Sequence, residues 1–142
     1  MPFILDTDLL TILQEQSQPA CDRLLARLRK QPPDDIYVTI ISFQERIQGW
    51  MTVLNQARSA DRLIRAYAKL GALLQSFCKM RIVPFDQAAQ DHFVDLRKQR
   101  LRIGTMDLRI ACIALATGST LLSRNLQDFR QVPGLIVEDW SS

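Results

Sequence analysis

The sequence predicts an α/β fold: a three-layer α/β/α sandwich around a mostly parallel five-stranded sheet. Five short apolar runs, each bounded by turn or cap residues, have the length and composition of buried parallel strands. Segments with apolar residues at helical spacing separate these runs. Because right-handed crossovers place helices on both faces of a parallel sheet, this alternation indicates three layers.

The five predicted strands are each only a few residues long. A strand that is buried on both faces shows continuous apolar residues, whereas a half-exposed strand alternates apolar with polar ones. The runs cover Phe3–Leu5, Ile36–Val38, Arg81–Val83, Thr120–Leu122 and Leu135–Val137.

The predicted helices lie between the strands. In the first of them, Leu24, Leu25 and Leu28 share one face, as a helix that packs on a sheet requires. The helix before the fourth strand has Thr105 as its expected N-cap and Gly118 as its C-terminal signal. The five segments are Cys21–Arg29, Ile40–Leu54, Ser59–Cys78, Gln87–Arg100 and residues 104–118.

Length and composition favour one soluble globular domain over residues 1–142. The chain is 47% hydrophobic and 23% charged, and it has no linker, repeat or apolar run near the roughly 20 residues that span a bilayer. No Lys or Arg precedes the apolar residues at the N-terminus, so we expect no signal peptide. Three widely spaced cysteines, an odd number, indicate a reducing cytoplasm. A net charge of +3 permits a polyanionic partner without requiring one.

Acidic residues gather where the predicted strands end. Asp6 and Asp8 follow the first strand, Glu45 lies on the helix after the second, and Asp107 lies in the first turn of the helix before the fourth. Ligands of open α/β sheets bind beyond the carboxyl ends of the strands. If Asp6, Glu45 and Asp107 meet there, each pair 4 Å apart repels by about 4 kcal/mol at an effective dielectric of roughly 20. A hard divalent cation, Mg²⁺ or Mn²⁺, relieves this repulsion.

Four blocks follow one another along the chain: ILDTDLL, VTIISFQERIQG, RIGTMDLRIACIALATGSTLLSRNLQDF and VPGLIVEDW. Together they span nearly the whole sequence, and they resemble the PIN-domain family, in particular the VapC-type toxins of bacterial toxin–antitoxin pairs. The resemblance implies a PIN-like fold and an Mg²⁺- or Mn²⁺-dependent endoribonuclease that cuts structured RNA such as tRNA or rRNA. It also implies a homodimer that a small cognate antitoxin holds inactive.

The resemblance implies a role for each acid. The family's metal-binding acids fall on Asp6, Glu45 and Asp107, and we expect Asp6 and Asp107 to ligate directly while Glu45 orients or deprotonates the attacking water. The family's fourth acid falls on Asn125, whose neutral oxygen weakens any second metal site. Asp128 either takes that place or braces the short helix after the fourth strand.

Three neighbours of these acids have two interpretations each. Asp8 either adds negative charge near the metal or begins the helix after the first strand, and the second role is favoured because an acid in a first helical turn complements the helix dipole. Thr7 and Ser123 either donate hydrogen bonds to the acids or to phosphate, or they are structural turn residues.

Several cations flank the acidic residues in the sequence. RNA has to be drawn to a cleft that is itself negatively charged, so a nuclease needs positive charge beside its acids. The alternative for the basic run at 97–102 is a solvated helix end. The residues expected to contact RNA are Arg97, Arg102, Arg109 and Arg124.

Other functions fit the sequence less well. The single histidine, His92, excludes a metal-free ribonuclease that uses two imidazoles. A strand ending in DxD also opens haloacid-dehalogenase-like phosphatases, but their Gly-Thr and downstream Lys are missing. A catalytically weak PIN-fold module that binds RNA or protein is supported only by Asn125.

The helix at 59–78 carries an apolar stripe, and Trp50 and Met51 lie nearby in the sequence. Such a stripe is most often part of the core, but it also offers a surface for self-association or for an antitoxin segment. Its members are Leu63, Ile64, Tyr67, Leu70, Leu74 and Phe77.

Overall fold

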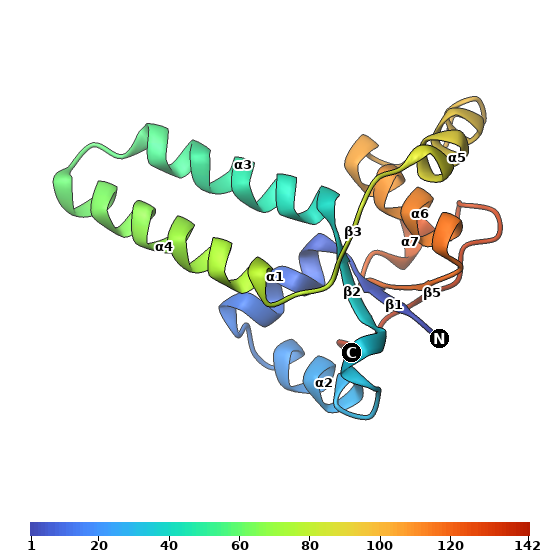
Figure 1. The fold of residues 1–142 in the computed structure, drawn as a ribbon, viewed down its shortest axis with the longest axis horizontal. Helices are drawn as coiled ribbons and strands as arrows, with labels where there is room; N and C mark the ends of the chain where they lie inside the picture. The colour runs from blue at the N-terminus through green and yellow to red at the C-terminus, as the bar shows by residue number, and fades with distance from the viewer.

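A computed structural model describes all 142 residues, and its centre is a five-stranded sheet in the order β3-β2-β1-β4-β5 (Figure 1). All four strand pairs are parallel. The predicted mostly parallel sheet is therefore confirmed, and no antiparallel strand is present. The strands are β1 Phe3–Leu5, β2 Ile36–Thr39, β3 Ile82–Val83, β4 Thr120–Leu122 and β5 Val137–Glu138.

Seven α-helices and one 3-10 turn connect the strands. The predicted helices are all present, with ends that differ by a few residues from the predicted ones. The α-helices are α1 Thr7–Glu15, α2 Ala20–Leu28, α3 Ile40–Gln56, α4 Ala60–Cys78, α5 Gln87–Arg97, α6 Thr105–Thr117 and α7 Leu126–Phe129, and the 3-10 turn is Pro33–Asp35.

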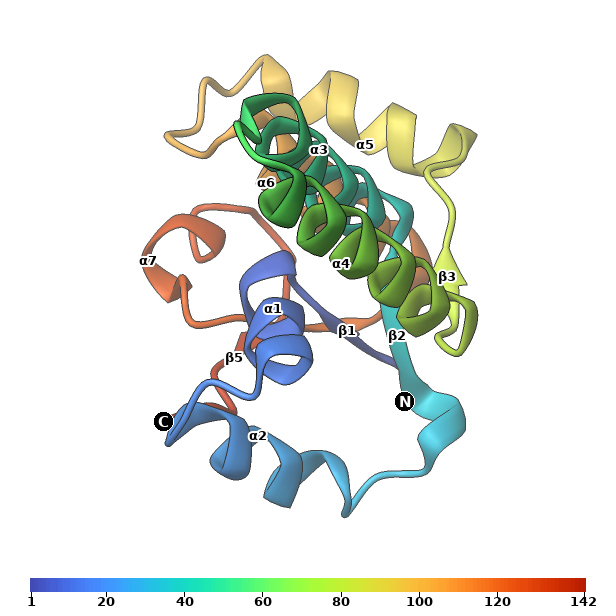
Figure 2. The same cartoon turned by 90° about the vertical axis from the view of Figure 1, so that its left-hand side faces the viewer.

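Two hydrophobic clusters pack on opposite faces of the sheet, as the three-layer prediction requires. Successive residues of a strand point to opposite faces, so Ile4 joins the cluster under α5 and α6, whereas Leu5 joins the cluster under α1 and α2. Leu121 and Leu122 of β4 divide in the same way. Figure 2 shows α5 and α6 on one side of the strands and α2 on the other.

The structure corrects three element ends. Gly104, with φ −63° and ψ 153°, is the N-cap of α6, so Thr105 is the first helical residue and its side chain does not cap the helix. Helix α5 ends at Arg97, before Arg100, whose φ of 51° cannot continue a right-handed helix. Strand β5 begins at Val137 because the Leu135 N–H donates to the Val132 carbonyl in a turn. The predicted helix end at Gly118 is confirmed, since Gly118 has φ 62°.

Helices α3 and α4 form a hairpin that extends away from the sheet (Figure 1). Ile64, Tyr67 and Leu74 of the predicted stripe are more than half exposed, whereas Phe77 is buried. A groove of about 420 Å³ between the two helices is lined by apolar side chains. Most of the stripe is therefore surface and not core, because this part of the hairpin extends beyond the sheet and the sheet does not cover it. The groove residues are Ile47, Met51, Tyr67, Leu70, Gly71 and Leu74. None of the helices combines the length and the apolar character that crossing a bilayer requires.

Candidate active site

Asp6 lies at the carboxyl end of β1 and is almost completely buried, with 3% of its surface exposed. Its N–H donates to the Leu122 carbonyl of β4 at 3.0 Å, and its carboxylate accepts from the Leu9 N–H at 2.9 Å. Asp6 is thus the N-cap of α1. Asp8, which the sequence favoured as the beginning of this helix, lies in its first turn.

Burial raises the pKa of Asp6 from 3.8 to about 6. Hydrogen bonds from Ser123 and from the Leu9 N–H oppose this rise, and the negative charges of Asp8 and Asp107 add to it. The Ser123 hydroxyl also accepts from the Asn125 N–H at 2.9 Å, so the structure gives it the role of a turn residue beside its effect on the pKa of Asp6.

Asp107 lies in the first turn of α6 and is half-buried. Burial is the main reason why its pKa is raised, and repulsion from Glu45, Asp128 and Asp8 follows. These acids come from different elements, so the tertiary fold brings into electrostatic contact acids as far apart in the chain as Asp6 and Asp107. Asp107 therefore acts electrostatically on Asp6 and is acted on by Glu45, but no three of these acids are close enough to hold one ion together, so their convergence on one metal stays a prediction.

Glu45 is held by a hydroxyl group of another element. Thr7 Oγ1 donates to Glu45 Oε1 at 2.7 Å and lies 2.8 Å from Ser42 Oγ. Thr7 thus donates a hydrogen bond to an acid, which is one of the two roles predicted for it. Ser42 is not among the residues predicted from the sequence, although it precedes Glu45 by three residues and so lies on the same face of α3.

Asn125 and Asp128 bond to each other. The Asn125 Nδ2 donates to Asp128 Oδ2 at 2.9 Å, and Asn125 Oδ1 accepts from the Asp128 N–H at 3.4 Å as the N-cap of α7. Asn125 was expected to complete the fourth corner itself, but both of its polar groups serve Asp128. The negative charge at this corner belongs to Asp128, which helps to raise the pKa of Asp107.

Arg124 forms a two-point ion pair with Asp8 across the end of the sheet. Its Nε and Nη2 donate to the two carboxylate oxygens at 2.8 Å and 3.1 Å. Asp8 therefore fits the structural role, and its possible metal role gains no support because both of its oxygens are engaged. A phosphate that contacts Arg124 has to compete with Asp8.

Arg109 and Arg97 lie against one aromatic ring on the α5 and α6 side of the molecule. Their guanidinium carbons are 5.2 Å and 5.5 Å from the centre of the buried Phe93 ring. Cation–π attraction holds both charges near one place. Arg102 is fixed through its backbone, which exchanges two hydrogen bonds with the Gln131 side chain at 2.9 Å and 3.0 Å.

The acids fit a hard divalent ion in kind, but they do not form a closed cage. Their ligand atoms are carboxylate oxygens, which hard cations prefer. A nearby cation would lower the raised pKa of Asp6 and of Asp107. No three His, Cys, Asp or Glu side chains are close enough to hold one ion together. This arrangement suits Mg²⁺ or Mn²⁺, since Mg²⁺ keeps several waters and binds through one or two carboxylates.

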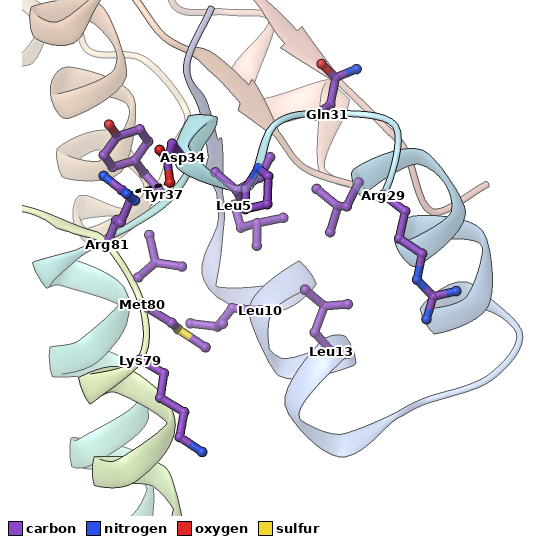
Figure 3. A pocket seen from close by; sticks show the side chains of 14 residues that line it. Leu5, Leu10, Leu13, Arg29, Gln31, Asp34, Tyr37, Lys79, Met80 and Arg81 are labelled. Atoms are coloured by element: carbon purple, nitrogen blue, oxygen red, sulfur yellow. Dashed lines mark hydrogen bonds and ion pairs between the residues drawn. The ribbon is translucent and has the colours of Figure 1, made fainter.

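The largest cavity, about 720 Å³, lies elsewhere and contains no predicted site residue (Figure 3). Leu10 and Leu13 of α1 form one wall, and Met80 faces them from the segment between α4 and β3. An exposed ion pair of 2.6 Å between Arg81 and Asp34 stands at its rim. No sequence signal pointed to this cavity because its lining comes from five separate segments.

The fold and the acidic edge agree with a comparison of the sequence with known families. A model of the PIN domain matches residues 3–135, and the chain therefore belongs to the PIN domain family. This membership sets aside the haloacid-dehalogenase-like alternative.

Among individual relatives, the chain is similar to Ribonuclease VapC1 of Haemophilus influenzae strain R2866, with 24% identity over 141 residues and 99% of both chains. It is 33% identical to Ribonuclease VapC2 of Rickettsia felis over 66 residues, which cover 44% of this chain and only 49% of that relative. The structure of VapBC-1 from nontypeable Haemophilus influenzae covers 100% of both chains with a TM-score of 0.76 at 24% identity. At this identity the structural likeness shows the fold.

Proposed function

We propose that this protein is a metal-dependent endoribonuclease that hydrolyses RNA phosphodiester bonds, tRNA or rRNA, and acts as the toxin of a toxin–antitoxin pair. One observation carries the proposal. Burial, together with the negative charges of acids on α1, α3, α6 and α7, raises the pKa of Asp6 and of Asp107 at the carboxyl end of a parallel sheet, in a chain of the PIN domain family. A nuclease uses such a concentration of negative charge to hold a divalent metal beside the scissile phosphate.

Each acid has a separate task in this proposal. Asp6 and Asp107 would hold Mg²⁺ or Mn²⁺, which when bound polarises a phosphoryl oxygen and lowers the pKa of a water. Glu45, anchored through Oε1 by Thr7, would orient the attacking water and accept its proton. Asn125 would keep Asp128 directed at the fourth corner.

The metal requirement is the first test. Purified protein treated with EDTA is expected to leave RNA intact, and addition of Mg²⁺ or Mn²⁺ is expected to restore cleavage. The reason is that the buried and mutually repelling carboxylates supply no positive charge to stabilise the transition state. Cleavage is measured on tRNA and rRNA by gel electrophoresis. Full activity in EDTA would contradict the proposal.

RNA would cross the α5 and α6 side of the site, where Arg97 and Arg109 lie on Phe93. Arg97→Gln and Arg109→Gln are expected to weaken RNA binding and to reduce the slope of log K against log salt by about 0.7 for each lost phosphate contact. Binding to catalytically inactive protein is measured between about 50 and 200 mM salt. Arg23→Gln on α2 is the matched control, and an equal slope in all three variants would remove this face from the RNA path.

The antitoxin would cover the exposed groove of the α3 and α4 hairpin, whose apolar lining has no cover within the chain. Exposed apolar patches of this kind mark protein interaction sites. Dimer formation stays a prediction that light scattering can test. We place the protein in the cytoplasm because its three cysteines are free, and two of them are buried.

A second candidate function, a PIN-fold module that binds RNA or protein with little catalysis, is favoured by two observations. Asn125 stands where an acid is expected, and no three acids surround one point. Tight RNA binding without cleavage in Mg²⁺ and in Mn²⁺ would support this function over the nuclease.

A further inference from the structure

Three side chains from two helices form one directed chain of hydrogen bonds beside the acids. The Thr7 hydroxyl donates to Glu45 Oε1 at 2.7 Å and is 2.8 Å from the Ser42 hydroxyl. A hydroxyl has one proton, and Thr7 gives its proton to the carboxylate. The Ser42 hydroxyl must therefore donate to Thr7, so the direction runs from Ser42 through Thr7 to Glu45.

Rigid backbone holds both hydroxyls in place. Ser42 is completely buried in the first turn of α3, and its N–H donates to the Thr39 hydroxyl that caps this helix at 3.2 Å. Thr7 follows Asp6 directly and is the first residue of α1, a helix that Asp6 caps by accepting from the Leu9 N–H at 2.9 Å. The chain thus ties the α3 residue Glu45 to the segment that carries Asp6.

We propose that Ser42 and Thr7 are positioning residues of the nuclease site: together they fix the Glu45 carboxylate relative to Asp6. This inference rests on the proposed function. A glutamate side chain is costly to immobilise because it has several rotatable bonds. The bond from Thr7 occupies Oε1 and leaves Oε2 without a protein partner, available to a water. Catalytic groups lose about 100-fold in rate when they are misplaced by roughly 1 Å, so such anchoring matters for turnover.

Four single variants and one double variant, Thr7→Val with Ser42→Ala, test the chain of bonds. Thr7→Val keeps the shape and loses the hydroxyl, Thr7→Ser keeps the hydroxyl, and Ser42→Ala removes the first donor. Thr11→Val is the matched control, because its hydroxyl also lies on α1 but bonds only to the Thr7 carbonyl. The measurements are kcat and KM for metal-activated RNA cleavage and Mn²⁺ affinity by calorimetry.

A positioning role predicts a distinct pattern. Thr7→Val is expected to lower kcat by about 10- to 100-fold and Ser42→Ala by about 10-fold, with smaller changes in KM and Mn²⁺ affinity. Thr7→Ser restores kcat and Thr11→Val leaves it unchanged. Thr7→Val with Ser42→Ala is no slower than Thr7→Val alone, because Ser42 acts only through Thr7. Additive losses, or equal activity of Thr7→Val and Thr11→Val, would overturn the inference.

Crystal structures provide a readout that does not depend on activity. In the wild type and in Thr7→Ser, one conformer of Glu45 is expected on the residue 7 hydroxyl. In Thr7→Val and in Ser42→Ala, the carboxylate is expected to move or to occupy several conformers. A Glu45 that stays in place in both variants would refute the positioning role whether or not the protein cuts RNA. A wild type that cuts no RNA but shows the expected shift would refute the proposed function alone.

Discussion

Asp6→Asn is expected to reduce metal-dependent RNA cleavage by at least about 100-fold and, at the same time, to stabilise the fold at pH 8. Activity falls because the amide loses the negative charge that would hold the metal, and even partners one step removed from a metal ligand contribute about 10- to 100-fold. Helix α1 remains capped, since Asn accepts the Leu9 N–H as well as Asp does.

The gain in stability follows from the raised pKa of Asp6. Because the pKa rises from 3.8 to about 6 on folding, the folded state binds more protons than the unfolded state between these values. Wild-type stability is therefore lost as pH rises through about 6, by roughly 3 kcal/mol in full. Asp6→Asn removes this loss and should recover up to about that amount at pH 8, with little gain at pH 4.

Urea unfolding of the metal-free wild type and Asp6→Asn at pH 4, 6 and 8 measures this effect. Asp61→Asn is the control, because Asp61 is an exposed residue in the first turn of α4. Added Mg²⁺ should stabilise the wild type and leave Asp6→Asn unchanged. Equal unfolding free energies of the wild type and Asp6→Asn at pH 8 would show that burial of this carboxylate has no energetic cost.

Asp107→Asn is the second change with a large expected effect: a loss of cleavage of at least about 100-fold with a near-normal fold. Asp107 is half-buried, and the charges of Glu45, Asp128 and Asp8 help to raise its pKa. The amide keeps the shape of the side chain and relieves this repulsion. Mn²⁺ affinity should therefore fall while the unfolding free energy is maintained or increased.

Cleavage of tRNA and calorimetric Mn²⁺ titration test this variant beside Asp95→Asn, an exposed acid on the neighbouring helix α5. Asp95→Asn should match the wild type in both measurements. If Asp107→Asn retained activity within about threefold of the wild type, Asp107 would not be a metal ligand, because a lost ligand costs more than that.

The sequence by itself determined the sheet and the edge at which the acids gather. Short apolar runs and helical spacing are local patterns, so β1 and β4 could be predicted with their exact ends. In a parallel sheet all carboxyl ends lie at one edge, and this rule alone predicted that Asp6 lies near the start of the helix that carries Asp107. Local pattern could not place the α6 cap, where Gly104 rather than Thr105 has the extended backbone.

Only the tertiary structure decided how the side chains at that edge are paired. Thr7 meets Glu45 across 38 positions of the chain, and Asp8 meets Arg124 across 116. The exposure of the α4 stripe could likewise not be predicted from the sequence, because the apolar periodicity is the same whether or not a sheet covers the helix. The physical reason is that periodicity and caps are properties of neighbouring residues, whereas hydrogen bonds and burial at the site depend on distances between elements that the fold alone sets.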